Sequence, residues 1–447
     1  MSIPVIAIFD IGKTNKKLFL FDEEYTIVFE KSAHLPETID EDGDPCEDID
    51  VLQKWIMDSF HETNSLAAFR IEAINFSTYG ASFVHLGKDH KPITPLYNYL
   101  KSFPEDLKTK FYSTYGGEKA FAQATASPVL GLLNSGMQLY WLKYKKPDVF
   151  EKIKVSLHLP QFISSLFTGI HYTDITSIGC HTNLWNFQDN HYHQWVREEE
   201  VDRKLAPIKP SDSVIPSKIN QQPIVSGIGL HDSSAALIPY LSCFPEPFIL
   251  LSTGTWCISL NPFNNMPLTD KELSHDCLCY FTYKGNAVKA SRLFTGLEHE
   301  QQVKKLADHF HQNETYYSNI GYNPEIVKEM KNISFQEDKL AEYQSYEVAY
   351  TLFIKDLVKR QVTSTNRVLN NTPVKRIFVD GGFSKNQIFM HLLSEAMPSL
   401  EVYAASIAQA TALGAAMAIH HHWNNKPLRN TIIDLQYFPT SSGAALI

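Results

Sequence analysis

The chain has 447 residues, of which 44% are hydrophobic and 20% charged, an ordinary globular composition that excludes a disordered or fibrous protein. Its length is about three times the commonest domain size and favours two domains. A net charge of −9 without a basic block argues against nucleic acid or an anionic membrane as a partner, and the apolar runs are too short to span a membrane. Charges interrupt residues 1–20, so we expect no signal peptide, and six scattered cysteines indicate free thiols in the cytoplasm.

In the first half of the chain, apolar runs and turn residues predict strands that alternate with helices. The expected strands cover residues 5–9, 17–21, 25–30, 71–76 and 82–86, and the expected helices cover 48–63, 135–144 and 159–166. Thr168-Gly169 is a typical stop for the last of these helices.

A second block begins near Gln222. It is predicted to contain strands at 223–225, 376–379 and 401–404, a strand–turn–strand at 247–260, and helices from 232, at 340–370, at 387–396 and at 410–420. The alternation favours an α/β class with parallel strand pairs. Because the two halves look alike, we expect two similar lobes with a ligand-binding cleft between them.

The segment from Asp10 to Lys17 joins two predicted strands through a short polar turn. Residues 7–14 also match a relaxed P-loop pattern, but a P-loop leads into a helix, whereas this turn leads into a strand. The turn would therefore offer backbone N–H groups to phosphate, and Asp10 beside that anion would need a metal between them. The alternative is an ordinary hairpin with Asp-x-Gly as its turn.

Two later segments have a similar character. Ser252–Trp256 is a second small-residue turn between strands, rich in hydroxyl groups that can donate to phosphate oxygens. Asp380-Gly381-Gly382 ends a strand before a helix, where glycine allows the backbone to approach a flat ligand closely. The alternatives are a plain hairpin and a tight strand–helix turn.

Asp232 is the candidate general base. It follows two glycines and His231, and it opens an Ala-rich helix. A carboxylate in that place could take a proton from an alcohol during phosphoryl transfer. The alternative is that Asp232 is only the N-cap of its helix.

Taken in order, these motifs resemble those of the FGGY carbohydrate kinases, in the sugar kinase–actin–heat-shock ATPase superfamily. Asp10–Lys17 is similar to the first phosphate motif, Gly229–Ala236 to the catalytic-aspartate motif, and Ser252–Trp256 to the second phosphate motif. Asp380–Gly382 with Asn386 is similar to the adenosine motif, and Gln409–Ala416 to the closing helix. The His231-Asp232 pair and Ser252–Trp256 look most like the L-rhamnulose and L-fuculose kinases.

The resemblance implies two actin-like (ribonuclease H-like) lobes, formed by residues 1–240 and 241–447, with ATP and a sugar in the central cleft. It implies Asp232 as general base and places Asp10 and Asp232 near Mg²⁺. The residues that it implies for ATP are Gly12, Lys13, Thr14, Asn15, Lys17, Gly254, Thr255, Gly381, Gly382 and Asn386, and those for the sugar are Tyr79, Gly80, His231 and Asp232. Homodimers are common among such kinases.

The sugar side departs from the family's pattern. After Pro95-Leu-Tyr97, relatives usually have an aromatic residue and then an Asp or Arg pair that binds sugar hydroxyls, whereas this chain has Asn98–Lys101. We expect phosphorylation of a primary hydroxyl of a ketose such as L-rhamnulose or L-fuculose. The alternatives are a D-xylulose/ribulose-type or other polyol kinase, a non-catalytic sensor of sugar or nucleotide, and an actin- or chaperone-like ATPase.

Overall fold

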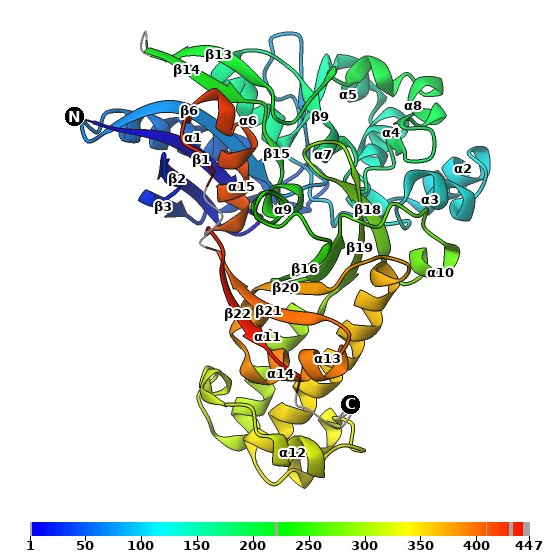
Figure 1. The fold of residues 1–447 in the computed structure, drawn as a ribbon. Helices are drawn as coiled ribbons and strands as arrows, with labels where there is room; N and C mark the ends of the chain where they lie inside the picture. Colours follow the sequence, from blue (N-terminus) through cyan, green and yellow to red (C-terminus); the bar gives the residue numbers. More distant parts are fainter. Residues whose placement is uncertain (1, 220–221, 408, 429–431, 441–447) are drawn as a thin grey trace.

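The computed structural model describes residues 2–219, 222–407, 409–428 and 432–440, and it contains two large sheets that lie one above the other in Figure 1. The first has the strand order β13-β14-β6-β1-β2-β3, with β15 beside β6. Its strands are β1 (Ile3–Ile11), β2 (Lys16–Asp22), β3 (Ile27–Ala33), β6 (Phe69–Thr78), β13 (Val214–Ile219), β14 (Gln222–Gly227) and β15 (Leu230–His231).

The second sheet has the order β18-β19-β17-β16-β20-β21-β22. Its strands are β16 (Phe248–Thr253), β17 (Cys257–Asn261), β18 (Cys277–Phe281), β19 (Ala287–Leu293), β20 (Arg376–Gly381), β21 (Glu401–Ser406) and β22 (Asp434–Phe438). β1 pairs antiparallel with β2 and parallel with β6, and β16 likewise pairs antiparallel with β17 and parallel with β20. The two lobes therefore repeat one strand plan, which confirms the predicted α/β class with similar halves.

Helices pack on both sheets, and the first lobe also contains several short strands. The helices are α1 (Ile49–Asn64), α2 (Glu105–Thr114), α3 (Glu118–Thr125), α4 (Gly136–Lys145), α5 (Pro147–Lys152), α6 (Leu159–Thr168), α7 (Ile175–Ile178), α8 (Gln194–Glu198), α9 (Asp232–Cys243), α10 (Asp270–Leu273), α11 (Thr295–Phe310), α12 (Pro324–Glu329), α13 (Tyr346–Leu369), α14 (Gln387–Ala396) and α15 (Ala410–Ala418). The short strands are β4 (Glu37–Ile39), β5 (Pro45–Glu47), β7 (Phe83–Leu86), β8 (Val155–His158), β9 (Thr173–Asp174), β10 (Trp185–Asn186), β11 (His191–Tyr192) and β12 (Ile208–Lys209).

Several local predictions are confirmed. α14 has the predicted bounds, and α6 ends at Gly169, whose φ of 67° is the left-handed conformation that favours glycine. The helix predicted at 340–370 begins only at Tyr346, where Ser345 caps it, and a short 3-10 helix over Glu337–Glu342 precedes it. No helix in the described part of the chain is both long and apolar enough to cross a membrane.

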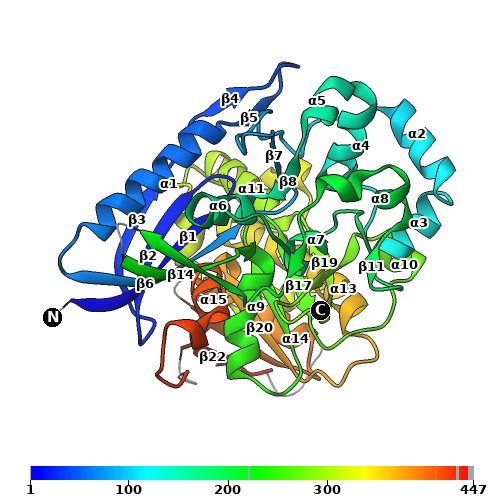
Figure 2. The same ribbon diagram turned by 90° about the horizontal axis from the view of Figure 1, so that it is seen from above.

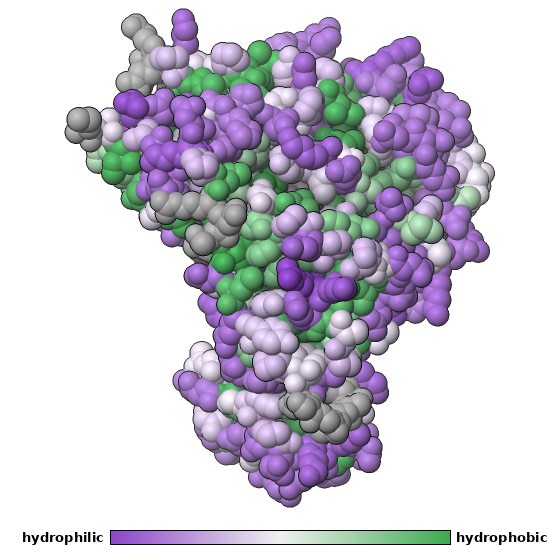
Figure 3. All heavy atoms as spheres, viewed as in Figure 1, coloured by the Kyte–Doolittle hydropathy of each residue, from purple (hydrophilic) through white to green (hydrophobic). Residues whose placement is uncertain are grey.

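Helix α9 lies between the two sheets. Ala235 and Ile238 belong to the hydrophobic cluster that joins α15 to β1 and β2, whereas Leu237 and Tyr240 belong to the cluster under β16 and β20. Figures 1 and 2 show α9 and α15 side by side. Polar residues cover most of the face drawn in Figure 3, and apolar residues gather toward the waist between the lobes. The start of α9 is therefore held by both lobes.

The two helices approach each other closely where Gly414 meets Ala235. A Cβ on Gly414 would lie 1.8 Å from the carbonyl oxygen of Ala235. Pro239, inside α9, has no N–H to donate to that carbonyl four residues earlier. On the other side of α15, Nδ2 of Asn75 donates to the carbonyl of Ala415 at 2.8 Å, which ties the helix to β6. Only glycine fits at position 414.

We predict that Gly414→Ala destabilises the protein by about 1–3 kcal/mol, because α9 and α15 must separate to admit the methyl group. Gly321→Ala is the matched control, since a Cβ there meets nothing within 4 Å. Chemical denaturation of both variants measures the difference. Equal stabilities would contradict the close helix crossing.

Candidate active site

The candidate residues gather where neighbouring strands of the first sheet end. Ser77 on β6 is in register with Asp10 of β1 on one side and with Leu230 of β15 on the other. Asp232 is the first residue of α9, directly after β15. The parallel pairing therefore brings Asp10 and Asp232 to the same end of the sheet, as the sequence motifs predict.

Asp10 is a partly buried carboxyl whose surroundings oppose its ionisation. Burial and the negative charge of Asp232 raise the pKa of Asp10 to about 7, and Lys17 acts in the opposite direction. A divalent cation beside both carboxylates would remove this penalty. Two carboxylates suit Mg²⁺, which usually completes its shell with water and phosphate oxygens. Across the described residues, no group of three or more His, Cys, Asp or Glu side chains could hold a metal ion.

Asp232 itself reaches solvent. The N-cap position of α9 belongs to His231, so Asp232 is not the N-cap residue. Its Oδ1 accepts a hydrogen bond from the backbone N–H of Ser233 at 2.6 Å, and its side chain is 35% exposed. A carboxylate in this state can receive a proton from a bound ligand.

His231 is packed tightly behind Asp232. Its Nε2 lies 3.2 Å from Oδ1 of Asp232 and 3.1 Å from Sγ of Cys180, and its ring stacks on Tyr280. A Cβ on Gly80 would lie only 2.8 Å from the same Nε2. Gly80 is thus required for the packing of His231, and His231 orients Asp232.

The first predicted phosphate turn lies between β1 and β2. The N–H of Gly12 donates to the carbonyl of Asn15 at 2.9 Å, which closes the turn around Lys13 and Thr14. Lys17 is opposite Asp10 in the strand pairing.

Side chains of this region reach beyond the turn. Nζ of Lys17 donates to Oε1 of Gln409, just before α15, at 3.3 Å. Lys13 instead forms an ion pair of 3.1 Å with Glu37 on β4. The structure therefore brings Lys17, but not the charge of Lys13, to Asp10.

The second predicted phosphate turn is held from behind by the start of α11. The N–H of Gly254 donates to the carbonyl of Trp256 at 2.9 Å, and the N–H of Leu297 donates to the carbonyl of Thr255 at 3.1 Å. A Cβ on Gly296 would lie 1.7 Å from the carbonyl oxygen of Gly254, so α11 contacts the turn directly.

A cavity of about 510 Å³ opens beside this second turn, a size suited to a nucleoside. Its lining includes Gly254, Gly382 and Asn386 of the predicted ATP residues, together with His299 of α11. Gly381 precedes Gly382 with φ of 92°, where a Cβ would lie 2.1 Å from the carbonyl oxygen of Thr253. The glycine pair thus allows β20 to pass closely by the second turn.

Asn386 contributes to the wall of this cavity with its amide already bonded. Its Oδ1 accepts from the N–H of Phe389 at 3.0 Å, which caps α14. Its Nδ2 donates to the hydroxyl of Tyr350 at 2.6 Å, and that hydroxyl lies 2.9 Å from Nε2 of His299. These bonds fix the side chain of Asn386 and use one of its two N–H donors, and its contact with the nucleotide remains a prediction.

On the predicted sugar side, two tyrosines face each other. The hydroxyl of Tyr79 donates to Oε2 of Glu47 at 2.5 Å, and the ring of Tyr79 lies 6.3 Å from that of Tyr99. Burial and the charge of Asp232 raise the pKa of Tyr99. The sequence analysis did not single out Tyr99 as a site residue.

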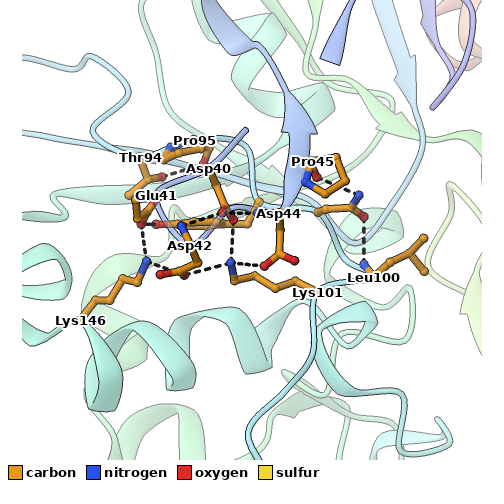
Figure 4. Close-up of polar contacts among 12 residues, drawn as sticks. Asp40, Glu41, Asp42, Asp44, Pro45, Thr94, Pro95, Leu100, Lys101 and Lys146 are labelled. Atoms are coloured by element: carbon orange, nitrogen blue, oxygen red, sulfur yellow. Dashed lines mark hydrogen bonds and ion pairs between the residues drawn. The ribbon is translucent and has the colours of Figure 1, made fainter. Parts of the chain in front are cut away.

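The residues that depart from the family pattern bond to a neighbouring loop. Nζ of Lys101 lies 2.7, 2.9 and 2.6 Å from carboxylate oxygens of the acidic loop (residues 40–44), at Asp40, Asp42 and Asp44 (Figure 4). Nδ2 of Asn98 donates to the carbonyl of Pro45 at 3.1 Å. Of this segment, we therefore assign only Tyr99 to the site.

We predict that Asp10→Asn stabilises the ligand-free, metal-free protein, and more at pH 8 than at pH 5. The folded-state pKa of about 7 lies above the ordinary value of 3.8, so ionising Asp10 costs stability progressively between those values and fully above them. The gap between the variant and the wild type should widen by on the order of 3 kcal/mol from pH 5 to pH 8.

Chemical denaturation in a chelator at both pH values measures this gap. Asp106→Asn is the control, because Lys145 lowers the pKa of this exposed carboxyl and its replacement should not stabilise the protein. A gap that stays constant with pH would contradict the raised pKa of Asp10.

Comparisons with known proteins identify the family of the chain. The model of the FGGY family of carbohydrate kinases, N-terminal domain, matches residues 5–232, and that of the C-terminal domain matches residues 296–423. A rhamnulokinase from Oceanobacillus iheyensis is 23% identical over 76% of this chain and 77% of its own length.

Solved structures share the fold. A carbohydrate kinase from Novosphingobium aromaticivorans has a TM-score of 0.81 at 21% identity, covering 98% of this chain and 95% of that one. A xylulose kinase from Lactobacillus acidophilus has a TM-score of 0.80 at 16% identity, covering 98% and 94%. The two family domains together span most of the chain, which therefore belongs to the FGGY family of carbohydrate kinases and is a phosphotransferase that acts on a sugar.

Proposed function

We propose that this kinase transfers the γ-phosphoryl group of ATP to a primary hydroxyl of a free ketose, with Asp232 as general base. The main support is the arrangement of the partly buried carboxylates of Asp232 and Asp10 at one end of the first sheet. A base must reach the sugar hydroxyl, and a second carboxylate must help to hold the cation that accompanies ATP.

The remaining residues have distinct roles in this proposal. Lys13–Asn15 of the first turn and Thr255 of the second present backbone N–H groups to the phosphates, whereas the N–H groups of Gly12 and Gly254 already bond within their turns. Lys17 adds a positive charge beside Asp10. The cavity beside Gly382 takes the nucleoside. Mg²⁺, bound by Asp10 and Asp232 with phosphate oxygens, would neutralise charge on the transferred group.

In the reaction, Asp232 accepts the proton of the sugar hydroxyl while the hydroxyl oxygen attacks the γ-phosphorus of ATP. The bond between this phosphorus and the oxygen of ADP breaks, and ADP leaves. His231 holds the carboxylate in place through its 3.2 Å contact. Tyr99 and the backbone at Gly80 line the approach of the sugar. Catalysis is then mainly positioning and charge stabilisation, as for phosphoryl transfer in general.

For the substrate, we favour L-rhamnulose or L-fuculose. The rhamnulokinase relative and the His231-Asp232 and Ser252–Trp256 motifs support this choice. A D-xylulose-type or other polyol substrate is the alternative, supported by the likeness to a xylulose kinase.

We predict that Asp232→Asn lowers sugar-dependent ADP release by about 10²–10⁴-fold, because no general base remains. Binding of Mg-ATP should be retained through Asp10 and the two turns, weakened only by the loss of one carboxylate from the Mg²⁺ site, as titration of a fluorescent ATP analogue would measure. Glu105→Gln is the matched control, since Glu105 is also the first residue of a helix, α2, and should leave turnover unchanged. Retained turnover in Asp232→Asn would refute the role of Asp232 as base.

We also predict that, in a panel of free sugars with Mg-ATP, a ketose gives the highest kcat/KM. The panel holds L-rhamnulose, L-fuculose, L-ribulose, D-xylulose, D-ribulose, glycerol and D-gluconate, with a reaction without sugar as control. Phosphorus NMR of the product should show a phosphate ester on a primary carbon.

Other outcomes separate the alternatives. ATP binding without turnover of any sugar would favour a sensor of sugar or nucleotide. ADP release at the same rate without sugar would favour an ATPase of the actin or chaperone kind.

A further inference from the structure

A buried ion pair lies directly behind the first phosphate turn, and the proposed chemistry does not use it. Nζ of Lys16 is 2.7 Å from Oε1 of Glu47, and the two side chains are 3% and 5% exposed. Removing two charges from water costs free energy that their attraction often fails to repay, so a buried pair is weak evidence for stability. The contacts of this pair indicate a positional role instead.

Lys16 holds the turn from behind. Its Nζ donates to the carbonyl oxygens of Gly12 and Lys13, each at 3.0 Å. These bonds use two of the three donors of the ammonium group, and its contact with Glu47 is an ion pair. The carbonyl groups of Gly12 and Lys13 are therefore held toward the ammonium group of Lys16.

Glu47 extends the same network to the sugar side. While Oε1 pairs with Lys16, Oε2 accepts the hydrogen bond from the hydroxyl of Tyr79 at 2.5 Å. The backbone N–H of Tyr79 also donates to the carbonyl of Ile11, at the end of β1, at 3.0 Å. A single carboxylate thus contacts both the side chain behind the phosphate turn and the tyrosine that packs against Tyr99.

The hairpin that carries Glu47 is anchored at its far end. The acidic loop at its tip bonds to Lys101 and also to Lys146, which lies 2.8 Å from Oδ2 of Asp42 (Figure 4). Lys101 belongs to the segment that carries Tyr99. The same contacts therefore hold both the hairpin of β4 and β5 and this segment, and they fix the position of the backbone that carries Glu47.

We propose that Glu47 is a positioning residue that couples the first phosphate turn to the sugar side of the site, through Lys16 on one oxygen and Tyr79 on the other. The inference rests on the proposed function, because it takes the turn as an ATP site and Tyr79 as part of the sugar site. Loss of the charge on Glu47 then loosens both at once.

The test compares Glu47→Gln with Glu272→Gln. Glu272 forms a similar buried pair with Lys289, at 2.6 Å, in the second lobe and away from the site. We expect Glu47→Gln to raise both the Kd for Mg-ATP, measured without sugar, and the KM for the sugar by about fivefold or more. Glu272→Gln should leave both constants unchanged, with a comparable loss of thermal stability.

A coupled network also makes substitutions non-additive. Tyr79→Phe should raise the sugar KM in the wild type but add little further effect in Glu47→Gln. Should Glu47→Gln fail to fold, the double variant Lys16→Met/Glu47→Gln removes both buried charges and should show the same weakening of Mg-ATP binding.

The inference is overturned if Glu47→Gln, or the double variant in its place, loses stability while the Kd for Mg-ATP and the sugar KM stay within about twofold of the wild type. If the wild type phosphorylates no sugar, the proposed function fails. The titration with Mg-ATP alone still decides the inference in that case, because unchanged binding refutes it and weakened binding supports the anchoring of the turn by Glu47.

Discussion

Helix α9 packs against α15 on one side and against the second sheet on the other, and the position of Asp232 depends on this double contact. The contact requires Gly414, because any side chain there would meet the carbonyl of Ala235. The remaining parts of the site are arranged around the end of β6, where β1 brings Asp10 and β15 leads into α9. Backbone packing thus determines where the two carboxylates meet, and the groups around Asp10 shift its pKa.

The charged residues that hold the site in place have partners of opposite charge within the protein, whereas the candidate catalytic carboxyl groups are only partly paired. Lys16 with Glu47 and Lys101 with the acidic loop are paired within the protein, and these pairs are complete without a ligand. Asp10 is compensated only in part, since burial and Asp232 raise its pKa despite Lys17. The protein therefore holds two carboxyl groups together where Mg-ATP is proposed to bind, and a cation there would favour the ionised form of Asp10.

Local patterns in the sequence predicted the strands β1 and β2, the turn between them, helix α14 and the α/β class, since each depends on neighbouring residues. They did not predict β18 and β19, whose strands bury both apolar and polar side chains. The domain limits at residue 240 remain a prediction. In the site, Asp10 and Asp232 were named from motifs, whereas Glu47 and Tyr99 come from segments without a motif. Because side chains alternate along a strand, Lys16 and Lys17 point to opposite faces of the sheet. This rule alone would have predicted different roles for the two lysines.

The packing of α15 has a consequence for the synthesis of the chain. Ile6, Ile8 and Phe19 of the first sheet are covered by a helix that begins at Ala410, near the end of the described residues. An N-terminal portion leaving the ribosome therefore exposes an apolar sheet face until α15 has been made. Products of premature termination before residue 410 would keep that face uncovered, and chaperones and proteases would meet them as incompletely folded chains.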